Sequence, residues 1–161
     1  MIAMNEYQAS VKTPFAHLGL RLEDDQLVGV EFIDRKDEIS PSTKTAKTLC
    51  AHVRQYCKTP DVITSNNIPC KLNGTAFQQK VWKALREIPA GKVMTYGELA
   101  KKVGSSARAV GNACRKNPVP VVIPCHRVVS ANGPGGYAGA TQGTLFDIKC
   151  WLLDHEGARH S

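Results

Sequence analysis

The sequence predicts an α/β protein in two parts: a small N-terminal antiparallel sheet with one helix, packed on a mostly helical C-terminal part that contains a helix-turn-helix. Apolar residues alternate in the first third, they recur at three- and four-residue steps further on, and two short helical segments flank a glycine. The chain has 161 residues, which suffices for one core or two small ones. The polar segment 59–67 is the expected connector, which gives domains 1–68 and 69–161.

The N-terminal part should contain a β-hairpin followed by a helix. Apolar residues alternate in two runs on either side of Asp24 and Asp25, which is typical of strands joined by a tight turn. The residues expected on the buried faces are Leu18, Leu20 and Leu22 in the first run and Val28, Val30 and Phe32 in the second. From Thr43 the apolar spacing becomes helical, and Thr59 and Pro60 should end this helix.

The C-terminal part should begin and end with an amphipathic helix. The first opens at Thr75, where the Thr-x-x-Gln spacing matches a capping box. Thr144 is expected to cap the last helix, which should end near Glu156 and Gly157. The expected buried stripes are Phe77, Val81, Trp82 and Leu85 in the first helix and Leu145, Ile148, Trp151 and Leu152 in the last.

Two short helices between them form the helix-turn-helix candidate. Thr95 opens the first with a second capping signature, and Gly104 breaks it. Ser105 or Ser106 can cap the second, which should end near Lys116 because a proline follows closely. This second helix carries small residues, so it is poor in side chains for reading bases in a major groove.

After the motif the chain is expected to run extended and then to loop. Prolines punctuate the apolar run from Val119 to Pro124, so we expect an extended backbone that delivers Cys125. Glycines then cluster between residues 133 and 143. That composition is typical of a loop that moves or that lets another molecule approach its backbone.

Charge distribution points to a polyanionic partner. The net charge is +7, and no Asp or Glu occurs between Glu98 and Asp147. The basic residues of this acid-free stretch are Lys101, Lys102, Arg108, Arg115, Lys116 and Arg127. They form an unopposed positive field, as nucleic-acid-binding proteins do. On charge alone, a solvated basic face without function remains an equal alternative.

The six cysteines are expected to be free thiols. They are far apart, without a CxxC pair or matching Cys/His spacing, so we expect no metal site. No apolar run approaches the roughly 20 residues of a membrane span. Residues 1–8 carry Glu6 and lack a basic leader and an apolar core, which argues against secretion. We therefore expect a cytoplasmic protein that does not contact membranes.

The segment from Pro124 to Val128 has the composition of a nucleophilic site. A thiol attacks as the thiolate, and the neighbouring His126 and Arg127 should lower the pKa of Cys125. In an extended strand, however, adjacent side chains point to opposite faces, so a bridging water or a bend would be required. Taken alone, a Cys-His pair is more often a buried structural thiol beside a surface histidine.

Several motifs in one order together resemble the O6-alkylguanine-DNA alkyltransferases over about residues 74–157. They are Phe77-Gln78-x-x-Val81-Trp82, Ile88-Pro89-x-Gly91-x-Val93-x-Thr95-Tyr96, Arg108-Ala109-Val110-Gly111-Asn112-Ala113, Asn117-Pro118-Val119-Pro120, Ile123-Pro124-Cys125-His126-Arg127-Val128-Val129 and Leu152-Leu153-x-x-Glu156-Gly157. The resemblance implies DNA repair by direct, irreversible and stoichiometric transfer of an alkyl group from O6-alkylguanine to a cysteine. It also implies nucleotide flipping, minor-groove binding of double-stranded DNA by a monomer, no cofactor, and association with the nucleoid on DNA.

The resemblance also assigns catalytic roles. Cys125 would accept the alkyl group, with its proton relayed through water to His126, which Glu156 orients. Tyr96 would help to neutralise the departing guanine, and Asn117 would tie the recognition helix to the active-site strand. Taken alone, Tyr96 is more often a packing residue and Glu156 a solvated helix-end acid.

Further residues are implied for DNA and for the guanine pocket. Arg108 would enter the base stack and replace the extruded base, although alone it is more often a plain surface charge. The other DNA contacts are Thr95, Ala107, Ala109, Gly111 and Arg115, and the pocket residues are Val128, Tyr137 and Ala138. Ala140 stands where relatives often have a second glycine, which can narrow the rim of the pocket. The N-terminal zinc ligands of some relatives are also missing.

Three other functions compete with alkyl transfer. An alkyltransferase-like lesion sensor lacks the acceptor cysteine, whereas this chain has Cys125. A helix-turn-helix transcription regulator needs polar base-reading residues, which Ala107 to Ala113 do not supply. A cysteine hydrolase needs an oxyanion hole, for which the sequence offers no clear motif. The other thiols, including Cys114, are expected to be inert packing residues.

Overall fold

A computed structural model describes residues 7–34, 38–60, 68–131, 133, 135 and 143–158. The chain divides into two compact units, Met1–Asn73 and Gly74–Ser161. This division lies a few residues beyond the predicted boundary because the segment after the connector pairs with a strand of the first unit. The amide of Leu27 donates to the carbonyl of Pro69 at 2.8 Å, and the amide of Lys71 donates to the carbonyl of Leu27 at 2.9 Å.

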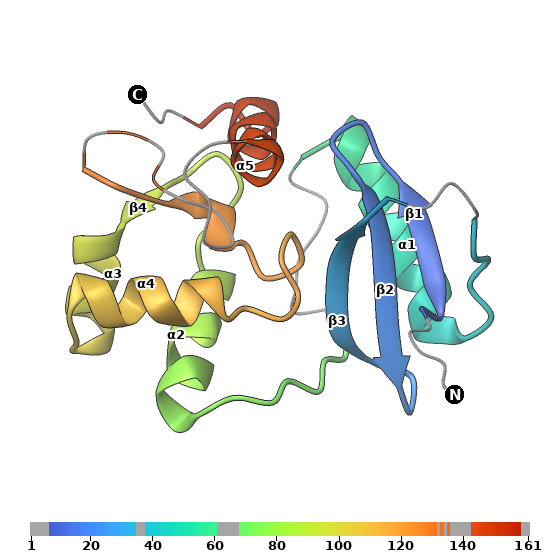
Figure 1. Cartoon of the computed structure of the whole chain (residues 1–161), viewed down its shortest axis with the longest axis horizontal. Coiled ribbons are helices and arrows are strands. Elements are labelled where there is room, and N and C mark those ends of the chain that lie inside the picture. Colours follow the sequence, from blue (N-terminus) through green and yellow to red (C-terminus); the bar gives the residue numbers. More distant parts are fainter. Residues whose placement is uncertain are drawn as a thin grey trace. The chain divides into compact units, whose positions relative to one another are not determined.

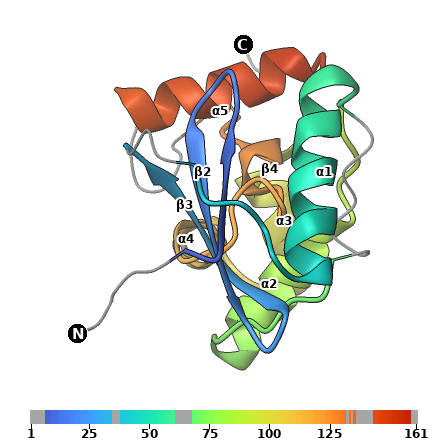
Figure 2. The same ribbon diagram turned by 90° about the vertical axis from the view of Figure 1, so that its right-hand side faces the viewer.

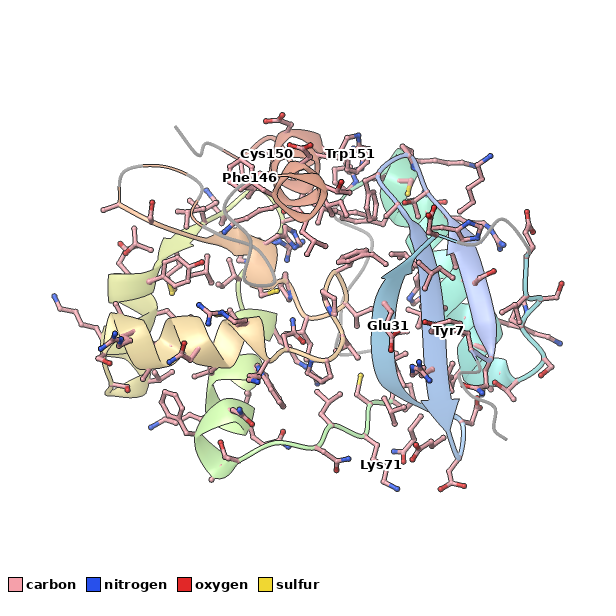
Figure 3. All side chains as sticks on the ribbon, viewed as in Figure 1. Tyr7, Glu31, Lys71, Phe146, Cys150 and Trp151 are labelled. Carbon is pink, nitrogen blue, oxygen red and sulfur yellow. The ribbon has the colours of Figure 1, made fainter. Side chains whose placement is uncertain are left out.

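The first unit is a three-stranded antiparallel sheet with one helix (Figure 1). The strands β1 (Ala9–Lys12), β2 (His17–Glu23) and β3 (Gln26–Ile33) lie in the order β1-β2-β3, and α1 (Lys44–Lys58) packs along one face (Figure 2). The predicted hairpin and helix are therefore confirmed. On the exposed face, the Tyr7 hydroxyl donates to Glu31 at 2.6 Å (Figure 3).

The turn of the hairpin is fixed against the start of α1. Asp24 and Asp25 have φ of 51° and 57°, the left-handed conformation that a two-residue type I′ turn requires. The Asp25 carboxylate accepts from the backbone amide of Thr45 at 3.2 Å, while Thr43 caps the same helix. Two orphan amides of α1 thereby obtain acceptors from outside the helix.

The predicted buried face of β3 is only partly confirmed, since Val30 is buried whereas Val28 and Phe32 are half-buried. Leu22 pairs with Leu27 while Arg21 pairs with Gly29, so Val28 is the additional residue of a bulge. Leu27 is therefore fully buried and Val28 only half-buried.

The second unit contains four α-helices and two short strands among its described residues. They are α2 (Ala76–Arg86), β4 (Met94–Thr95), α3 (Tyr96–Val103), α4 (Ala107–Arg115), β5 (Val128–Val129) and α5 (Thr144–His155). The strands β4 and β5 pair in parallel, and α2, α3 and α4 pack on one another. No helix in the described part of the chain is long and apolar enough to cross a membrane.

The predicted helix-turn-helix is present as α3 and α4. Thr95 and Glu98 form the expected capping box, with reciprocal hydrogen bonds of 3.0 and 2.8 Å. Gly104 ends α3 with φ of 71°, where a side chain would be strained, and Ser106 caps α4. Thr75 forms the other predicted capping box, at the start of α2.

The segment before Cys125 is folded into turns rather than extended. The amide of Ile123 donates to the carbonyl of Val119 at 2.9 Å, and Val121 has φ of 74°. A β-branched residue adopts this left-handed conformation only where its surroundings hold it there. The two flanking prolines suggested extended chain, but tertiary contacts override that preference.

The last helix differs from its prediction at both its cap and its buried face. The N-cap is Gly143, and Thr144 is already helical. The buried residues of α5 are Ile148, Lys149, Leu152 and Leu153. The expected Leu145 and Trp151 are half-buried, and Figure 3 shows Trp151 on the opposite side of α5 from Phe146 and Cys150.

Candidate active site

Cys125 opens a short 3₁₀ turn, Cys125–Arg127, and is 7% exposed. Asn117 fixes the chain that leads to it. The Asn117 side chain donates to the carbonyl of Ile123 at 2.9 Å and accepts from the amide of Val119 at 3.0 Å. The end of α4 is thereby tied to the backbone immediately before the cysteine.

His126 and Glu156 form a buried pair. The imidazole Nε2 lies 2.8 Å from the Glu156 carboxylate, and both side chains have no exposed surface. Burial lowers the pKa of His126 in spite of the carboxylate, so the ring is neutral at pH 7. A neutral ring that donates from Nε2 leaves Nδ1 as an acceptor. In the described part of the chain, Nδ1 is buried without a hydrogen-bond partner.

The expected ionisation of Cys125 is wrong for the resting protein. Burial raises the pKa of its thiol, although hydrogen bonding from Asn117 and the charge of Lys149 act in the opposite direction. The Arg127 guanidinium turns to Glu156 instead of to the sulfur. The resting group is therefore a thiol, which must lose its proton in order to attack.

Lys149 is a site residue that the sequence analysis missed. It is fully buried, and its ammonium donates to the carbonyl of Val128 at 2.6 Å. Burial lowers the pKa of Lys149 to about 8, while the nearby thiols of Cys125 and Cys114 raise it. The signal lay in the helical spacing, since Lys149 precedes the buried Leu153 by one turn.

Tyr96 is the first residue of α3 and is half-buried. Its ring lies against two glycines. A Cβ at Gly135 would come within 3.1 Å of the ring, and one at Gly111 within 3.9 Å. The Lys149 ammonium lies 5.8 Å from the ring centroid. Burial, followed by the charges of Cys114 and Cys125, raises the pKa of Tyr96 to about 12, so the phenol keeps its proton at neutral pH.

The residues predicted to contact DNA lie along α4 and at the start of α3. Ala107, Arg108 and Arg115 are exposed, and Ala109 and Gly111 are half-buried. The hydroxyl of Thr95 accepts from the amide of Glu98, so part of its hydrogen-bonding capacity is used in capping.

The positive charge of the protein is concentrated in the second unit. Residues 74–161 contain 12 Lys or Arg and five Asp or Glu, whereas residues 1–73 contain nine of each. Lys101, Lys102 and Lys116 are exposed as expected, but Lys102 is not unopposed, because it pairs with Glu87 at 2.9 Å. Arg127 is an exception, because it is 6% exposed and paired with Glu156. It does not contribute to a basic surface.

Of the residues predicted to line a guanine pocket, the structure describes only Val128. Val128 is fully buried, and its carbonyl already accepts from Lys149. Tyr137, Ala138 and Ala140 lie outside the described residues.

Cys114 is packed close to the site. It is 8% exposed, and burial together with the charge of Cys125 raises its pKa to about 12. This agrees with the expected inert thiol. All six cysteines are free, and no group of three or more His, Cys, Asp or Glu residues in the described ranges could hold a metal ion.

Comparisons with known proteins point to one family. A family model described as "6-O-methylguanine DNA methyltransferase, DNA binding domain" matches residues 76–158. A probable methylated-DNA–protein-cysteine methyltransferase of Acanthamoeba polyphaga mimivirus is 37% identical over 91% of this chain and 93% of that protein. The methylated-DNA–protein-cysteine methyltransferase of Shigella flexneri is 50% identical over 57% of this chain and 53% of that protein.

A solved structure extends the likeness to the fold. The O6-methylguanine methyltransferase of Mycobacterium tuberculosis gives a TM-score of 0.75 at 31% identity, over 92% of this chain and 90% of that chain. The same protein has been crystallised in complex with DNA, and that structure gives a TM-score of 0.72.

The fold and the site define a mixed α/β protein in which a helix-turn-helix stands beside a buried cysteine and a His–Glu pair. The predicted fold class is confirmed by its solved relative. The chain belongs to the O6-methylguanine-DNA methyltransferase family. The resemblance seen in the sequence motifs is thereby confirmed.

Proposed function

We propose that this protein repairs alkylated double-stranded DNA by moving an alkyl group from O6 of guanine to the sulfur of Cys125, once per molecule. The observation that carries the proposal is the buried Cys125 followed directly by a His126 whose Nε2 lies 2.8 Å from Glu156. The carbon–oxygen bond to O6 breaks while a carbon–sulfur bond forms. The product is a thioether, which has no good route to hydrolysis, so the protein does not turn over.

The thiol proton leaves through His126. Nδ1 of the imidazole is the acceptor, and a water molecule between it and the sulfur carries the proton, because adjacent residues do not face one another directly. The imidazolium that forms is stabilised by the Glu156 carboxylate, whose pKa is held well below its usual range by hydrogen bonds from His126 and Arg127 in spite of burial.

The leaving guanine is stabilised by Tyr96. Because its pKa is raised to about 12, the phenol is a hydrogen-bond donor at neutral pH and can neutralise negative charge that develops on the purine. Lys149 supplies a positive charge close to the sulfur of Cys125. Its ammonium also holds the backbone carbonyl of Val128 in the pocket wall. The sequence resemblance assigns Tyr137 and Ala138 to the same proposed pocket.

DNA is proposed to bind through α4 in the minor groove, with the damaged nucleotide flipped out. The small side chains of Ala107, Ala109 and Gly111 let the helix approach closely, and Arg108 fills the space left in the stack. Thr95 and Arg115 contact the backbone. The excess of basic residues in the second unit supports such binding, as does the crystallised DNA complex of the M. tuberculosis relative. Binding should weaken as salt concentration rises.

We further propose that the protein is a monomer in the cytoplasm that associates with the nucleoid on DNA. The six free thiols support a reducing compartment.

Intact-mass spectrometry after incubation with O6-methylguanine DNA tests the proposal. One methyl group adds about 14 Da, and peptide mapping should place it on Cys125. Retained binding without an adduct would indicate a lesion sensor instead. An adduct that water removes with time would indicate a hydrolase.

Arg108→Ala should slow repair of duplex DNA about 10- to 100-fold while leaving the reaction with free O6-benzylguanine unchanged, because the side chain acts on the base stack. Transfer rates on the two substrates measure this. Lys80→Ala is the matched control, since it removes one exposed positive charge from α2. Equal losses on both substrates would refute the stack-filling role.

A further inference from the structure

Arg127 joins three segments at the back of the active site. It belongs to the 3₁₀ turn of Cys125, and its Nη1 donates to the carbonyl of Ile88, beyond the end of α2, at 2.7 Å. Its Nε and Nη2 donate to the two oxygens of Glu156, at the end of α5, each at 2.9 Å. The side chain is 8% exposed and that of Glu156 is fully buried. This is the paired geometry in which a guanidinium binds a carboxylate most strongly.

The Glu156 carboxylate is therefore shared between two residues, which supply three donor nitrogens. Oε2 accepts from His126 and from Nη2 of Arg127, and Oε1 accepts from Nε of Arg127. A carboxylate with three charge-assisted or neutral donors is held in one orientation and has little tendency to take a proton. His126 must then be the donor in its bond to Glu156.

We propose that Arg127 is a positioning residue for alkyl transfer: it orients Glu156 and keeps it a pure acceptor, so that the His126 proton stays on Nε2 and Nδ1 stays available for the thiol proton. This inference rests on the proposed function, since it concerns the same proton path. The proposed role of Arg127 is distinct from contact with DNA, because the residue is buried.

The charges around His126 determine in which direction its pKa should change when Arg127 is replaced. Glu156 raises the pKa of His126, while Arg127 and Lys149 lower it, all against a larger decrease caused by burial. Without the Arg127 guanidinium, its direct lowering of the His126 pKa is lost. The Glu156 carboxylate also becomes a stronger base. Both changes raise the pKa of His126. The ring would then be protonated at a higher pH and would lose its capacity to accept the thiol proton there.

The test compares Arg127→Gln with Arg127→Lys in the full-length protein. Transfer from an O6-methylguanine duplex is measured by quenched time points between pH 5 and pH 9. In the wild type, the rate should fall as pH drops through the pKa of His126. In Arg127→Gln this acidic limb should move up by about one pH unit, with a slower rate at every pH. Arg127→Lys keeps the charge but not the paired bonds, so it should be slower with its limb near that of the wild type.

A merely structural role predicts a different result. A folded Arg127→Gln protein with the limb of the wild type would overturn the proposal. If that variant does not fold, nitrogen-15 NMR of His126 in the wild-type protein decides, because the proposal requires a proton on Nε2 and none on Nδ1. The opposite tautomer would refute it. Absence of methyl transfer by the wild type at every pH would instead refute the proposed function, while the tautomer still tests Arg127.

Discussion

Cys125→Ser should lower methyl transfer by more than about a thousandfold and leave binding to O6-methylguanine DNA within a few-fold of the wild type. Serine is nearly isosteric, so the buried turn that holds residue 125 keeps its shape. A hydroxyl, however, is far less acidic than a thiol, so much less of it is ionised through His126, and its oxygen is a poorer nucleophile than sulfur. Intact mass reports transfer, and fluorescence anisotropy of a labelled duplex reports binding.

Cys114→Ser is the matched control for this experiment. Cys114 is a second buried thiol, 8% exposed, whose pKa is raised to about 12. Cys114 is not followed by a histidine that pairs with a glutamate, so it is not the proposed acceptor. The Cys114→Ser variant should therefore still accept one methyl group. If Cys125→Ser took up a methyl group, or if only Cys114→Ser failed to do so, the acceptor would be a cysteine other than Cys125.

The helices α2, α3 and α4 were predictable because their ends are encoded locally. Thr75, Thr95 and Ser106 each cap a helix through a hydrogen bond to an amide three residues later. Gly104 ends α3 because it adopts a left-handed conformation at little cost. Such signals need only a few neighbouring residues, so a sequence suffices to find them.

Features that depend on distant contacts were mispredicted or missed. The bulge at Val28 depends on how two strands pair, and the left-handed Val121 depends on the packing around a turn. Lys149 was passed over because a charged residue on a helix is usually exposed. The direction of the pKa of Cys125 was wrong because neighbouring residues suggested stabilising charges, whereas burial dominates. The motifs supplied the proposed reacting residues but not the environment that sets their protonation.

Glu156→Gln should both destabilise the protein and slow transfer, because one carboxylate serves two buried donors. Removing its charge leaves the Arg127 guanidinium buried without an anionic partner, which costs about 3–5 kcal/mol of unfolding free energy. The glutamine can present either its oxygen or its NH₂ group to His126, so the tautomer is no longer fixed. Loss of the orienting carboxylate should lower the transfer rate about 10²- to 10⁴-fold.

The loss of stability in Glu156→Gln should depend on pH, which distinguishes it from a general loss of packing. The pKa of Glu156 is lower in the folded protein than its ordinary value of 4.5. Its contribution to stability is therefore fully present above pH 4.5 and decreases as pH falls below that value. Urea unfolding of both proteins should show a large difference at pH 7 that shrinks toward pH 3.

Glu87→Gln is the control for loss of one carboxylate in the same unit. Glu87 forms an exposed ion pair with Lys102 at 2.9 Å, where solvent screens the interaction, so stability and transfer should change little. If Glu156→Gln and Glu87→Gln behaved alike, the carboxylate at the end of α5 would be a solvated charge. The relay from Cys125 through His126 would then lack the buried anion on which the stabilisation of the imidazolium depends.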